Sequence, residues 1–134
     1  MIRHQLSIFV ENEPGVLARV AKALADANVN LRALCVSDNV DDAVLRIVVD
    51  DDQKAIDILE RQGALVVSRE VVEVAVPDQP GALARIAALL AEKKSNISYA
   101  YGSAGGAGRA HLYLRIAEHA AEADAAIRDA LANG

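Results

Sequence analysis

Apolar residues along this chain follow two different spacings, and the changes between them mark out strands and helices. Short runs rich in Val, Ile and Leu are typical of strands, whereas apolar positions three and four residues apart indicate one face of a helix. The first half predicts strands at 4–10, 31–37, 43–49 and 65–67, a helix from Pro14 to a turn near Asn28, and a helix at 50–59. The second half predicts strands at 71–76, 96–101 and 110–116, with helices at 80–92 and 119–132.

The two halves also repeat one another in sequence. The run PGVLAR at 14–19 returns as PGALAR at 80–85, and matched pairs such as Leu24/Leu90 continue the register. The patterns together predict an α+β fold, with two ferredoxin-like βαββαβ units in tandem, antiparallel sheets and helices on one face. We expect the units to occupy residues 1–68 and 69–134.

The second repeat ends after its second helix, so it lacks an equivalent of strand 65–67 as its own last strand. In this fold the fourth strand pairs with the first, so segment 71–76 would present an unpaired apolar edge, which favours a homodimer or docking on a partner enzyme. In the alternatives, strand 65–67 bends back or continues into 71–76 as one long strand shared by both sheets. Either alternative would cover part of the edge internally.

Candidate chemistry lies in the turn at 11–17, where a strand ends and a helix begins. Backbone N–H groups of Gly15, Val16 and Leu17 at a helix start favour a carboxylate, helped by the helix dipole. Gly15 leaves room for a ligand to approach the backbone, and Asn12 offers a donor and an acceptor to an α-amino acid. The alternative is purely structural, with Asn12 or Glu13 acting only as a helix cap.

The run LSIFVENEPGVLARV at 6–20, followed by NVNL at 28–31, resembles the ACT domains of acetohydroxyacid synthase regulatory subunits and phosphoglycerate dehydrogenases. The resemblance covers nearly the whole chain, and it implies an amino-acid site to which Asn12, Gly15 and Asn30 contribute. The run DQPG at 78–81 resembles the wider ACT pattern, but Asp78 stands where the first repeat has Asn12, so we expect the second site to differ. The candidate residues of that second site are Gly81, Ala82, Leu83 and Asn96.

In the ACT family, two units pack side by side through their second strands, and the ligand lies between the turn of one unit and the second strand of the other. The resemblance therefore implies that 31–36 lies beside 97–101 and that Tyr99 joins a ligand pocket. The alternative for Tyr99 and Tyr101 is an ordinary strand position with the ring packed and the hydroxyl in water. The function implied is a non-catalytic amino-acid sensor or, as the alternative, a regulatory subunit of an amino-acid biosynthetic enzyme such as acetohydroxyacid synthase.

Composition narrows the remaining classes of function. The net charge is −5 and the 14 Lys and Arg residues are spread along the chain without a basic cluster, so we expect neither nucleic acid nor a membrane as a partner. The single cysteine, Cys35, excludes an intrachain disulfide and favours the cytoplasm. The glycine-rich run 102–108 lacks the Gly-Lys-Ser/Thr ending of a phosphate loop and predicts a mobile hairpin loop. No nucleophile–base pattern or metal-ligand spacing occurs, so we expect no enzyme activity, no metal and no cofactor.

Overall fold

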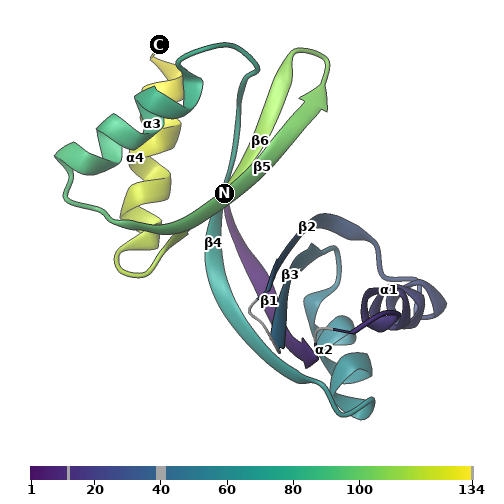
Figure 1. The fold of residues 1–134 in the computed structure, drawn as a ribbon. Coiled ribbons are helices and arrows are strands. Elements are labelled where there is room, and N and C mark those ends of the chain that lie inside the picture. The colour runs from purple at the N-terminus through teal and green to yellow at the C-terminus, as the bar shows by residue number, and fades with distance from the viewer. Residues whose placement is uncertain (12, 39–41, 134) are drawn as a thin grey trace. The chain divides into compact units, whose positions relative to one another are not determined.

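The structure is a computed structural model that describes residues 1–11, 13–38 and 42–133. The elements in chain order are β1 (Ile2–Glu11), α1 (Val16–Asp26), β2 (Leu31–Asp38), β3 (Asp42–Val49), α2 (Asp52–Arg61), β4 (Leu65–Pro77), α3 (Ala82–Glu92), β5 (Ile97–Gly106), β6 (Arg109–Ile116) and α4 (Ala120–Ala132) (Figure 1). The strands follow the order β2-β3-β1-β4-β6-β5. The pairs β1–β3, β2–β3, β4–β6 and β5–β6 are antiparallel. The predicted α+β fold with two ferredoxin-like units in tandem is confirmed.

The chain divides into two compact units. The first-repeat unit is His4–Arg69, and the second-repeat unit combines Met1–Arg3 with Glu70–Gly134. The strands β1 and β4 contribute residues to both units, because the division falls within each of them.

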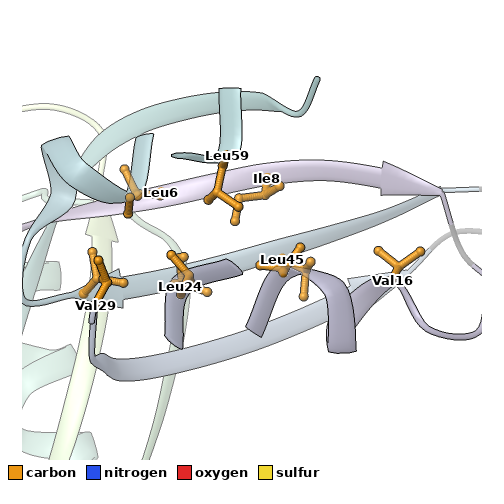
Figure 2. Close-up of a cluster of buried hydrophobic side chains, with 11 residues drawn as sticks. Leu6, Ile8, Val16, Leu24, Val29, Leu45 and Leu59 are labelled. Atoms are coloured by element: carbon orange, nitrogen blue, oxygen red, sulfur yellow. The ribbon is translucent and has the colours of Figure 1, made fainter. Parts of the chain in front are cut away.

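In the first-repeat unit, β3 lies between β1 and β2 and pairs antiparallel with both. Helices α1 and α2 cover one face of this sheet, so that face supplies the core. Figure 2 shows part of this core, with Val16 at one end of a row that continues through Leu45 and Leu24 to Val29. The buried core residues are Leu6, Ile8, Val16, Val20, Leu24, Val29, Leu45, Ile47, Val49, Ala55 and Leu59.

In the second-repeat unit, β6 lies between β4 and β5 and pairs antiparallel with both. Helices α3 and α4 lie together on one face of the sheet (Figure 1). Their apolar sides complete a second core, formed by Val72, Val74, Val76, Ile86, Leu90, Leu114, Ile116, Ala123 and Ile127.

The first three residues of the chain complete this second-repeat unit. The Glu73 N–H donates to the Met1 carbonyl at 2.8 Å, and Ile2 packs against the core. The Met1 ammonium lies 2.6 Å from Oδ1 of the buried Asp124, and Arg3 Nε donates to Glu73 Oε2 at 2.6 Å. The N-terminal segment is therefore held by its backbone, by an apolar side chain and by two ion pairs.

This arrangement decides between the alternatives for the missing strand. The segments predicted as separate strands at 65–67 and 71–76 form one continuous strand, β4, of 13 residues. The β4 residues Val72–Pro77 pair with β6, while Met1–Arg3 approach β4 from its other side. The prediction of an unpaired edge at 71–76 is wrong, because Met1–Arg3 lie along that edge of β4.

Two local predictions are also corrected. Pro14 and Pro80 do not open the helices, which begin two residues later, because Gly15 and Gly81 take the N-cap positions with φ of +89° and +94°. The glycine-rich run is not a long loop, since β5 extends to Gly106 and β6 resumes at Arg109. A Cβ on Gly102 would lie 2.4 Å from the His111 carbonyl oxygen, so glycine there permits close strand pairing.

The expected side-by-side pairing of 31–36 with 97–101 does not occur among the described strand pairs. Strand β2 pairs with β3, strand β5 pairs with β6, and β2 and β5 are the two terminal strands of the order. The second strand of each repeat therefore has an edge that no described strand pairs.

Candidate functional site

The turn before α1 has the geometry of an open helix start. Gly15 is the N-cap residue, and its carbonyl accepts the N–H of Arg19 at 3.0 Å as the first helical hydrogen bond. The N–H groups of the first helical residues have no acceptor within the helix, and glycine has no side chain to supply one. At a φ of +89° the residue adopts a conformation that glycine tolerates and other residues rarely do. The backbone amides at Val16 and Leu17 are therefore placed to bind an anionic group.

The second repeat has a similar backbone turn at Gly81, whose carbonyl accepts the N–H of Arg85 at 3.0 Å, but here the Ala82 N–H donates to the Gln79 carbonyl at 3.4 Å. In both repeats the residue after the glycine points inward, since Val16 is buried and Ala82 is half-buried. The next residue points outward, with Leu17 and Leu83 exposed by 44% and 52%. Val16 and Ala82 could therefore contact a ligand mainly through the backbone. Asn12 lies outside the described residues.

The structure does not bring Asn30 to the turn of its own unit. Glu11 pairs with Asp42 at one end of β3, whereas Leu31 pairs with Val49 seven residues further along. At roughly 3.3 Å per residue, the two ends are about 23 Å apart. The Asn30 N–H donates to the Asp50 carboxylate at 3.0 Å, so this backbone group has a local partner.

The predicted residues Asn96 and Tyr99 lie at the start of β5. Asn96 is exposed and lines a cavity of about 500 Å³ between the end of α3 and the start of α4. Tyr99 is half-buried and stands opposite Arg115 on β6. The neighbouring Tyr101 stacks on Tyr113, with ring centroids 5.3 Å apart and an interplanar angle of 12°. That stacking gives Tyr101 a packing role within its own sheet.

A second cavity, of about 400 Å³, lies beside the turn of the first repeat. Its lining residues are Phe9, Val10, Glu11, Glu13, Val16, Arg19, Val20, Leu59, Gln62, Gly63 and Ala64. Arg19 Nη2 lies 3.8 Å from Glu13 Oε1, and both side chains are largely exposed. Sequence reasoning did not identify Arg19 or Gln62 as site residues. The recurrence of an arginine at the matching positions 19 and 85 of the two repeats could have drawn attention to Arg19.

Two kinds of feature are absent from the described part of the chain. No group of three His, Cys, Asp or Glu residues there is arranged to hold a metal ion. No helix there has the length and apolar character needed to cross a membrane.

The fold and the turns together define a class of protein, namely a tandem of two ferredoxin-like units in which a Pro-Gly turn begins the first helix of each. The sequence model of the ACT domain pair matches residues 1–131. The chain therefore belongs to the ACT domain pair family.

Individual relatives agree with this assignment. Protein BT0572 from Bacteroides thetaiotaomicron is 34% identical with a TM-score of 0.89, over 96% of this chain and 88% of that one. The regulatory subunit of aspartate kinase from Thermus thermophilus shares the fold, with a TM-score of 0.73 over 96% of this chain and 92% of that one. Its sequence is 21% identical. A probable acetolactate synthase small subunit from Archaeoglobus fulgidus is 33% identical over 76 residues, which are 54% of this chain and 48% of the relative. The match thus spans about half the length of that curated relative.

Proposed function

We propose that this protein is a non-catalytic regulator that binds an α-amino acid at the turns preceding α1 and α3. The observation that carries the proposal is the open helix start at Gly15, where a residue without a side chain occupies the N-cap in a left-handed conformation. A carboxylate is the natural occupant of such a site, because the free amides and the helix dipole both favour negative charge. The similar turn at Gly81 offers a second position, although the Ala82 N–H there already donates to the Gln79 carbonyl.

We further propose that two copies of the chain associate through β2. Leu34 and Val36 stand opposite the core residues Ile47 and Leu45, yet they are exposed by 44% and 50% at the terminal strand of the sheet. Exposed apolar residues on an unpaired edge favour burial against another strand. If the β2 strands of two copies paired antiparallel, the start of β2 in one copy would lie beside the end of β2 in the other. Asn30 of one copy would then lie near the turn that precedes α1 in its partner.

The alternative function is that of a regulatory subunit held on a biosynthetic enzyme. The observation that favours it is the 33% identity to a protein named as an acetolactate synthase small subunit. Affinity purification of the chain from its own cells distinguishes the two, because a subunit co-purifies with a large catalytic partner in fixed ratio. The lone cysteine supports placing either form in the cytoplasm.

The proposed function is tested by thermal unfolding in the presence of each of the twenty proteinogenic amino acids at millimolar concentration. An amino acid that binds only the folded protein adds about 2.7 kcal/mol of stability at 100 times its Kd. We expect one amino acid, or a closely related group, to raise the melting temperature. The absence of any shift across the panel would overturn the proposed function.

A further inference from the structure

The two repeats differ in the helix that follows their third strand. Counted from the N-caps Asp51 and His119, α2 has 10 residues and α4 has 13. Arg85 Nη2 donates to the Ala130 carbonyl at 2.8 Å, and Ala130 is the eleventh residue of α4. The acceptor of Arg85 therefore belongs to the part of α4 that has no helical counterpart in α2.

Arg19 is the matching arginine of the first repeat, and its surroundings are different. The shorter α2 ends at Arg61, and the residues after it, Gln62 to Ala64, line the cavity of about 400 Å³ that Arg19 also lines. In the second repeat the arginine binds the backbone of its own fold. In the first repeat it faces solvent-accessible space next to the turn, with its side chain 68% exposed.

The acidic residues around this cavity are also specific to the first repeat. Glu11 and Glu13 line it, and the positions that match them in the second repeat hold Pro77 and Gln79. The first repeat thus places one guanidinium and two carboxylates around one opening. The buried side chains of Val16, Val20 and Leu59 form an apolar floor.

We propose that this cavity binds one α-amino acid per chain and that Arg19, together with the Val16 amide at the start of α1, holds its carboxylate. The ammonium group of the amino acid lies against Glu13 and Glu11, and an apolar side chain packs on Val16, Val20 and Leu59. This inference rests on the proposed function, which it sharpens by assigning the site to the first repeat and by giving roles to Arg19, Glu13 and Glu11. The cavity volume falls within the roughly 300–1,000 Å³ usual for small-molecule sites.

The charges also indicate which ligands the cavity rejects. One arginine and two glutamates give the opening a formal charge of −1, so a dicarboxylate would meet net repulsion. A monocarboxylate with a free α-amino group can pair both of its charged groups, whereas the corresponding 2-oxo acid leaves the glutamates without a cation. The cavity should therefore prefer an amino acid to its 2-oxo acid.

The test compares Arg19→Met with Arg85→Met in the full-length protein. The titrant is the amino acid from the panel of twenty that most raises the melting temperature of the wild type, and calorimetry measures Kd and stoichiometry. We expect Arg19→Met to raise Kd at least about tenfold, the size of one lost charge-assisted hydrogen bond, without unfolding the protein. Arg85→Met should leave Kd within about twofold and lower the melting temperature instead. Wild-type stoichiometry should be one per chain.

A second variant checks the other half of the site. Glu13→Gln should weaken binding of the same amino acid but not binding of its 2-oxo acid, because only the amino acid has an ammonium group that pairs with the Glu13 carboxylate. Unchanged amino-acid affinity in Arg19→Met, or two sites per chain, would overturn this inference while leaving the proposed function intact. Failure of the wild type to bind any amino acid would instead overturn the proposed function itself.

Discussion

The contact between Arg3 and Glu73 gives a quantitative test of how the N-terminal segment is held. The Glu73 side chain is only 11% exposed, and Arg3 Nε lies 2.6 Å from its Oε2. The Tyr113 hydroxyl donates to the other carboxylate oxygen at 3.3 Å. The change Glu73→Gln keeps the shape but removes the charge, which leaves the Arg3 guanidinium beside a neutral amide.

Hydrogen bonds to charged groups contribute about 1.5–3 kcal/mol, and Arg3 is 30% exposed, so water compensates part of the loss. We expect Glu73→Gln to lower the free energy of unfolding by about 1–2 kcal/mol. In a unit of this size, each lost kcal/mol lowers the melting temperature by roughly 4–8 °C. Because the chain has no tryptophan, circular dichroism during urea unfolding is the suitable assay.

The matched control is Asp26→Asn. Lys22 Nζ lies 2.8 Å from Asp26 Oδ2, a similarly short distance, but both side chains are mostly exposed. The hydrogen bond and the charge of Asp26 raise the pKa of Lys22. Water screens such a pair, so we expect Asp26→Asn to unfold like the wild type. Equal losses in the two variants, or no loss in Glu73→Gln, would refute the reasoning that burial decides the strength of the Arg3–Glu73 pair.

Three further changes test the packing of each unit. Leu24→Ala in the first-repeat core should cost about 2–5 kcal/mol in urea unfolding, because Leu24 is 1% exposed, and a loss below about 1 kcal/mol would contradict that packing. Gly102→Val should destabilise the β5–β6 hairpin by more than about 2 kcal/mol, since its Cβ would meet the His111 carbonyl. If this variant unfolded like the wild type, the two strands would not be so close. Deleting residues 1–3 should speed hydrogen exchange at the β4 amide of Glu73 while leaving β3 protected, and equal effects on both strands would argue against a local role.

Most of the fold could be predicted from the sequence because the repeat supplied two independent readings of each element. The strand at 43–49 and its counterpart at 110–116 were recognisable from their apolar runs, and β3 and β6 occupy nearly those ranges. The continuity of β4 could be raised from the sequence only as one of several alternatives. Its central residues Ser68-Arg69-Glu70 are polar, like a turn, and a local pattern does not distinguish a turn from an extended strand that exposes polar side chains.

The pairing of Met1–Arg3 with β4 was beyond local sequence reasoning, since it joins residues about 70 positions apart. The candidate site likewise has one part that the sequence predicts and one part that it does not. The positive φ of Gly15 agrees with the need for glycine at a tight helix start. The position of Arg19 on a cavity depends on where α2 ends, and helix ends are the least predictable feature of a pattern.

The split composition of the second-repeat unit has a consequence for synthesis on the ribosome. The first-repeat unit is a continuous segment, His4–Arg69, and a domain formed by one segment can fold as soon as that segment has emerged. Residues Met1–Arg3 are synthesised before this segment, whereas their partners Glu73 and Asp124 are synthesised after it. The second-repeat unit therefore cannot close until residues on both sides of the first-repeat unit have been made, whereas the first-repeat unit can mature earlier during translation.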